Sequence, residues 1–404
     1  MKYLSKRVES EDTGSRTFDS GLLHSLPDLV RRFAIGSTLV SIGIFISATG
    51  GSWDISNHLL NKPETFFSTP HAVLYTGVAV AILGTVIVWL VHRAISIYDN
   101  RLNISAKLTL AGICMLIVAG PIDFAWHSAF GLDGLLSPPH FVLLLGMIIS
   151  SLGAMLGIIS YVNNTIKRDF VKDEKDVIHK KDLPRPEAKR LNSRMILIII
   201  IGILPILMTF DGLIGMFSLP FSKTQYFNFN PDPISAAVLA TIGYPLILSL
   251  VLFSSFHLGK QKFGIISMIG ASYLAIHAMT AIIPNESLIQ TIPFYVLNIL
   301  PILASDILLS FSSNRVISIF VPGAILGSSF LMVQYPLITY VYNEVSSNQA
   351  FVWPSLISST YFGLMSNIYP LILGPAIAMG IVGAFLARKI TYSLNLTIEE
   401  VKKK

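Results

Sequence analysis

Two stretches of the chain carry one aspartate and two histidines at the same spacing. They are Asp54, His58 and His71 in the first stretch and Asp123, His127 and His140 in the second. Both follow the pattern Asp-x(3)-His-x(12)-His, and the surrounding segments 51–77 and 120–146 align without a gap. Two imidazoles and one carboxylate suit a divalent transition metal that keeps open coordination positions. The pattern therefore predicts a duplicated metal site.

Two other interpretations of these six residues stay open. They could form a hydrogen-bonded or proton-handling cluster, or they could be unrelated polar residues at a surface. The spacing does not decide whether two triads make two metal sites or share one.

The elements that must position these residues are two helical hairpins. Residues four apart project from one face of a helix, which places each Asp and the first His at a helix end. Ser68 and Ser137 stand at the expected N-cap positions of the return helices, with proline in the first turn. His71 and His140 would then lie near a helix N-terminus, where the dipole favours the neutral, metal-binding imidazole.

Composition predicts an all-α, polytopic membrane protein. Of the 404 residues, 52% are hydrophobic and only 13% are charged, which is unusual for a soluble chain of this length. Apolar runs of about 20 residues predict about ten transmembrane helices. They are 33–50, 70–92, 106–122, 139–162, 195–216, 234–255, 262–283, 290–311, 316–337 and 366–388. The apolar stretch 352–365 is either a re-entrant piece or part of a long helix.

The distribution of positive charge orients these spans. Of the 29 Lys and Arg residues, only Lys62 and Lys223 fall in the odd-numbered connections, which are those that follow the first, third, fifth, seventh and ninth spans. The positive-inside rule then predicts a multi-pass protein of the cell membrane with both termini in the cytoplasm. The first 32 residues show no apolar core followed by a cleavage site, so the first span is expected to act as its own insertion signal.

The spans and charged segments divide the chain into five predicted parts. These are a cytoplasmic segment 1–32, a four-helix membrane unit 33–162, a charged cytoplasmic loop 163–194, a six-helix membrane unit 195–388 and a cytoplasmic tail 389–404. The net charge of +6 lies mostly in the loop and termini, which suits anionic lipid head groups. The bilayer, and possible further membrane subunits, are the expected partners, and nucleic acid is not. The single cysteine, Cys114, excludes an intrachain disulfide and a cysteine-based metal site.

The six-helix unit resembles diverged copies of the same hairpin. Asp211 ends the fifth span without a histidine four residues later, and His277 near the end of the seventh has Tyr273 in place of the aspartate. We therefore expect five repeated hairpins, of which only the first two keep the complete set of polar residues.

The duplicated motif resembles a known copper site. Its spacing, with the Asp and first His closing one transmembrane helix and the second His opening the next, is similar to the copper-ligand motif in the C subunit of particulate methane and ammonia monooxygenases. The resemblance covers about 30 residues of each copy and implies that Asp54, His58 and His71 form one copper triad and Asp123, His127 and His140 a second. The stretch "DFAWHSAFGLDGLLSPPH" also resembles a family of prokaryotic polytopic proteins with a D-x-x-W-H … P-P-H signature.

Three classes of function remain open. The first is a membrane protein that binds copper, or else zinc or iron, and acts as an oxidoreductase or as a subunit of a monooxygenase-like complex. The second is a transporter or channel with an outward-facing Asp/His site for a metal ion, a proton or a small solute. The third is an accessory protein in the assembly of a membrane complex. Hydrolysis by a zinc-bound water is also chemically open.

Overall fold

The computed structural model describes most of the chain and consists of helices in the part that it describes. The described residues are 20–60, 62–63, 65–95, 100–131, 136–179, 191–218, 233–312, 314, 317–341 and 366–402, and these contain no strand. The all-α fold class is therefore confirmed. The stretch 352–365, predicted to be re-entrant or part of a long helix, lies outside the described residues.

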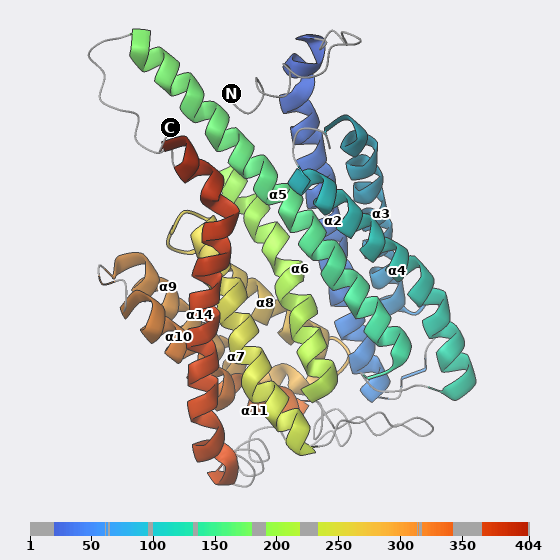
Figure 1. Cartoon of the computed structure of the whole chain (residues 1–404). Coiled ribbons are helices and arrows are strands. Elements are labelled where there is room, and N and C mark those ends of the chain that lie inside the picture. The colour runs from blue at the N-terminus through green and yellow to red at the C-terminus, as the bar shows by residue number, and fades with distance from the viewer. Residues whose placement is uncertain are drawn as a thin grey trace.

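The helices follow one another in an up-and-down order (Figure 1). They are α2 (Ser20–Leu59), α3 (Thr69–Ile95), α4 (Asn100–Phe130), α5 (Pro138–His179), α6 (Ser193–Ser218), α7 (Pro233–Leu258), α8 (Ile265–Ile282), the 3-10 turn η1 (Glu286–Thr291), α9 (Ile292–Phe311), α10 (Ile317–Ser329), the π-helical segment η2 (Phe330–Gln334), α11 (Tyr335–Tyr340) and α14 (Ser366–Lys402).

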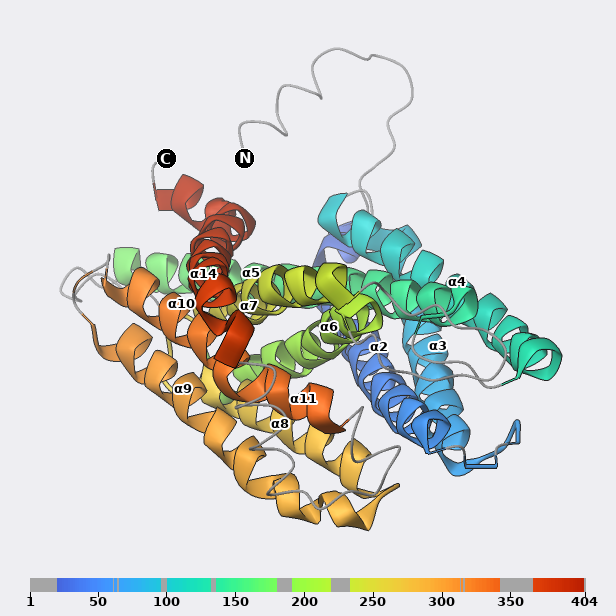
Figure 2. The same cartoon turned by 90° about the horizontal axis from the view of Figure 1, so that it is seen from below.

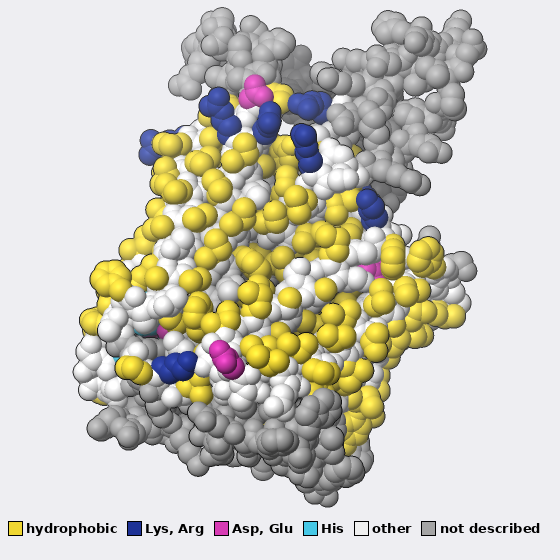
Figure 3. All heavy atoms as spheres, turned by 180° about the vertical axis from the view of Figure 1, so that it is seen from behind, with side chains coloured by type: hydrophobic (Ala, Val, Ile, Leu, Met, Phe, Trp, Pro, Cys, Tyr) yellow, Lys and Arg dark blue, Asp and Glu magenta, His cyan; other side chains and the backbone are white. Residues whose placement is uncertain are grey.

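Ten helical segments within the described ranges are long and apolar enough to cross a membrane, which confirms the predicted number. The ninth runs through α10, η2 and α11 as one span, Ile317–Ile338. Figure 3 shows the molecule from behind: apolar side chains cover most of the described surface in this view, and most of the visible Lys and Arg side chains lie near one end. An apolar belt with basic residues at its edge is the surface expected of a protein that lies in a bilayer.

Three helices run into the predicted cytoplasmic loop and terminal segments. α5 continues to His179, into the segment predicted as the loop 163–194, and α14 continues to Lys402, through the predicted tail. α2 begins at Ser20, before the first predicted span. These extensions are polar, so hydropathy does not detect them, but those of α5 and α14 contain no Pro or Gly and are rich in good helix formers.

The first two hairpins are packed through glycine in the same way. A Cβ atom on Gly43 of α2 would collide with the backbone at Gly77 of α3, and one on Gly112 of α4 would collide with the backbone at Gly146 of α5. Small residues let transmembrane helices approach closely. Since these four glycines occupy equivalent places in the two sequence copies, the repeat extends beyond the aspartates and histidines.

The remaining helices pack less regularly than five consecutive hairpins would. α7 makes its most extensive contact with α14, and α10 also packs along α14. Glycines again permit this approach: a Cβ atom on Gly383 of α14 would collide with the backbone of α7. Seen along the bundle, α2, α3 and α4 lie on one side, α9, α10 and α14 lie on the other, and α5, α6 and α7 run between them (Figure 2).

Candidate metal centre

The first hairpin brings its three predicted residues together. Asp54 lies one helical turn before His58 near the end of α2, and His71 lies in the first turn of α3. Nε2 of His58 is 3.5 Å from Oδ2 of Asp54, and Nε2 of His71 is 3.0 Å from Oδ1 of the same carboxylate. Nδ1 of His71 is 3.0 Å from the carbonyl oxygen of Thr65. A backbone contact of this kind fixes the orientation of an imidazole that binds a metal through its other nitrogen.

The second hairpin repeats this arrangement. Oδ1 of Asp123 on α4 lies 3.7 Å from Nε2 of His127 and 3.3 Å from Nε2 of His140 on α5. The hydroxyl of Ser137 accepts a hydrogen bond of 3.4 Å from the backbone N–H of His140, which is the N-cap predicted for this serine. Ser68 also precedes its helix directly, but its hydroxyl has no hydrogen-bond partner among the described residues.

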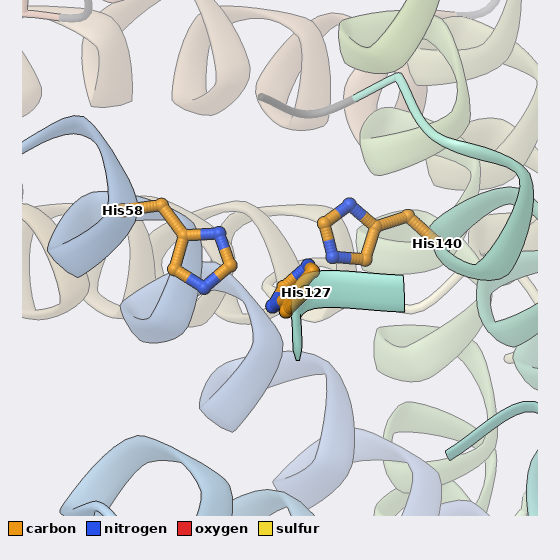
Figure 4. A group of neighbouring side chains, drawn as sticks. All are labelled: His58, His127 and His140. Atoms are coloured by element: carbon orange, nitrogen blue, oxygen red, sulfur yellow. The ribbon is translucent and has the colours of Figure 1, made fainter. Parts of the chain in front are cut away.

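The two triads meet and form one cluster. The ring centroid of His58 lies 4.9 Å from that of His127 and 5.9 Å from that of His140, and the latter two rings are 5.4 Å apart (Figure 4). Two groups in this cluster could hold a metal ion: Asp54 with His58 and His71, and His58 with His127 and His140. Ligand atoms lie within 4.8 Å of one another in each group. The second group thus combines His127 and His140 of the second hairpin with His58 of the first. From the sequence alone, Asp123 would be the third ligand of this group.

The distances between these polar atoms are informative about their chemistry. A good N–H···O hydrogen bond has a length of about 2.7–3.2 Å, and three of the four Asp–His distances are longer, at 3.3, 3.5 and 3.7 Å. Oδ1 of Asp54 and Oδ1 of Asp123 are buried, and within the described structure neither accepts a well-aligned hydrogen bond. Two ligands of a tetrahedral ion with bonds of about 2.0–2.2 Å would be about 3.3–3.6 Å apart. Two of the four distances, 3.3 and 3.5 Å, fall in this range, so the arrangement is compatible with co-ligands of a metal.

A cavity of about 200 Å³ adjoins the cluster. Five of the six predicted residues line it, the exception being His58. Much of the remaining wall is apolar or aromatic and includes Leu74, Tyr75, Leu143, Leu144, Met147, Met208, Met216, Tyr244 and Tyr295. A cavity with this lining suits a small molecule that is largely apolar.

Sequence reasoning missed a third Asp–His contact in the same cavity. Oδ2 of Asp211 on α6 lies 3.3 Å from Nε2 of His277 on α8, and both residues line the cavity. Each belongs to a different diverged copy, so neither copy alone shows the pattern. Their position at the same end of alternate spans was the signal that could have paired them.

The fold and the cluster define a class: an all-α, multi-pass membrane protein with buried Asp and His groups that could hold a metal ion. Comparison with protein-family models, with curated proteins and with solved structures finds no match to this chain.

Proposed function

We propose that this chain is an integral membrane metalloprotein and that the cluster of Asp54, His58, His71, Asp123, His127 and His140 binds a divalent transition metal. The observation that carries this proposal is the convergence of the two hairpins on His58, at spacings that fit metal ligands. Buried carboxylate oxygens without an aligned partner are costly, and a bound cation would remove that cost.

Copper is the first candidate for the ion. Imidazole and carboxylate ligands bind Cu²⁺ more tightly than the other divalent first-row metals, and four of the six residues are histidines. The resemblance to the monooxygenase copper motif supports the same ion. Zinc and iron suit the same ligand types and are the comparison ions in the test below.

The proposed activity is oxidation or reduction of a small, largely apolar molecule in the adjacent cavity, by this chain alone or as a subunit of a larger membrane complex. Bound copper would supply one-electron redox chemistry. The chain would orient the ion through α2 to α5, while the methionine and tyrosine side chains around the cavity would exclude water from the bound molecule.

This proposal is tested with protein purified in mild detergent, stripped of metal and reloaded with copper, zinc or iron. We expect copper to remain after desalting, and its electron paramagnetic resonance signal to disappear on reduction and return in air. Retained copper that cannot be cycled between oxidation states would contradict the redox function. Failure of all three ions to remain bound would contradict the metalloprotein itself.

Transport of a metal ion is the second candidate function. It is favoured by Asp211 and His277, because a third Asp–His contact in the same cavity offers an ion more than one position. Reconstitution into liposomes separates the two functions. Ion flux that requires these residues would support transport, and redox cycling without flux would support the oxidoreductase.

A further inference from the structure

Asp211 and His277 have the geometry of a ligand pair. The 3.3 Å between Oδ2 of Asp211 and Nε2 of His277 is the distance expected for two ligands of one tetrahedral ion. Nε2 of His277 is buried, and no described residue forms an aligned hydrogen bond with it. The His277 side chain as a whole remains 24% exposed, and both His277 and Asp211 line the cavity.

The other carboxylate oxygen of Asp211, Oδ1, accepts a hydrogen bond from a buried side chain. The Tyr273 hydroxyl donates a hydrogen bond of 2.6 Å to Oδ1 of Asp211, and it accepts one of 2.9 Å from Nε2 of Gln334. Tyr273 and Gln334 are both buried. Carboxylates that bind metals are commonly oriented by such a second layer of hydrogen bonds. Gln334 ends the π-helical segment η2, a conformation that is frequent at functional sites.

The charge of the cavity also favours a cation. The described residues that line it include three aspartates, Asp54, Asp123 and Asp211, and no lysine or arginine. Carboxylates in a low-dielectric cavity attract cations strongly when the groups beside them are neutral imidazoles rather than lysine or arginine.

We propose that Asp211, through Oδ2, and His277, through Nε2, bind an additional divalent metal ion in the cavity. Tyr273 and Gln334 act as positioning residues for Asp211. The site has two protein ligands, so water or a molecule in the cavity completes its coordination, and it binds metal more weakly than the six-residue cluster. This site is independent of the proposed redox activity.

The experiment is equilibrium dialysis of metal-free protein in detergent against buffered concentrations of free Zn²⁺, with bound zinc counted by mass spectrometry. We expect a tighter and a weaker class of ions in the wild-type protein. Asp211→Asn and His277→Ala should each abolish the weaker class and leave the tighter class, which also shows that the variant is folded. His277→Gln is a second variant that keeps more of the side-chain volume.

Matched tyrosine variants separate the positioning role from general packing. Tyr273→Phe should weaken the weaker class about tenfold. Tyr295→Phe, which alters another buried tyrosine, one that lines the cavity, should leave the weaker class unchanged. Zinc binding that Asp211→Asn and His277→Ala both leave unchanged, whether the wild type shows one class of ions or two, would overturn the proposal. Failure of the six-residue cluster is distinguishable, because only the tighter class would then be absent.

Discussion

Replacement of His58 by alanine is the most informative single change in the cluster. His58 belongs to both groups that could hold a metal, whereas His71 belongs only to the first and His140 only to the second. His58→Ala therefore removes a ligand from each group. His71→Ala leaves His58, His127 and His140 in place, so we expect it to have the smaller effect.

The size of the effect can be worked out from the number of ligands. Structural zinc sites with four ligands bind with apparent free energies of about 10–16 kcal/mol, or about 2.5–4 kcal/mol for each ligand. A change of about 1.4 kcal/mol is tenfold in affinity. Loss of the His58 imidazole should therefore weaken binding by about 100- to 1000-fold.

The assay is a competition titration of metal-free protein with a chromophoric chelator of known affinity. Ser128→Ala is the matched control, because this serine follows His127 directly and its hydroxyl donates a hydrogen bond to the carbonyl oxygen of Phe124 in its own helix. We expect the control to bind as the wild type does. Equal affinity in His58→Ala and Ser128→Ala would refute the shared-cluster reasoning.

Three further predictions test the account at other points. Metal affinity should fall as the pH is lowered through about 6.5, the ordinary pKa of imidazole, because protons compete with the metal for the same nitrogens; a pH titration of bound metal checks this, and affinity that does not change between pH 8 and pH 5 would count against histidine ligands. Gly112→Ala should lower thermal stability in detergent by about 1–3 kcal/mol, since its Cβ would collide with the backbone at Gly146, whereas Gly120→Ala in the same helix has open space around its Cβ and should be neutral or stabilising. Cysteines introduced at Ser128 and Ser193 in a Cys114→Ser background should be labelled differently in intact cells, Ser128 from outside and Ser193 only after permeabilisation; labelling of Ser193 alone in intact cells would reverse the predicted orientation.

The fold was largely predictable because a bilayer imposes a simple rule on sequence. Every backbone polar group in the membrane must be satisfied within a helix or a closed barrel, so long apolar runs such as 195–216 identify spans directly. The polar extension of α5 to His179 was not predicted, because helical structure outside the membrane depends on helix propensity rather than hydropathy.

The candidate site was predictable within each hairpin and not between them. The separation of four residues between Asp123 and His127 fixes their common helix face, and a short connection returns His140 to them. The contact of His58 with His127 depends on how two hairpins pack, which no local spacing encodes. For the same reason the contact of Asp211 with His277 appears only in the folded chain.

X-ray absorption at the metal edge of the copper-loaded wild-type protein tests the central claim most directly, because it reports the ligands of the ion itself. We predict nitrogen and oxygen neighbours at about 2.0–2.2 Å and the outer-shell scattering of at least two imidazole rings, which should diminish in His58→Ala. A spectrum without imidazole scattering, or a spectrum identical in the wild type and His58→Ala, would contradict a metal bound by this cluster.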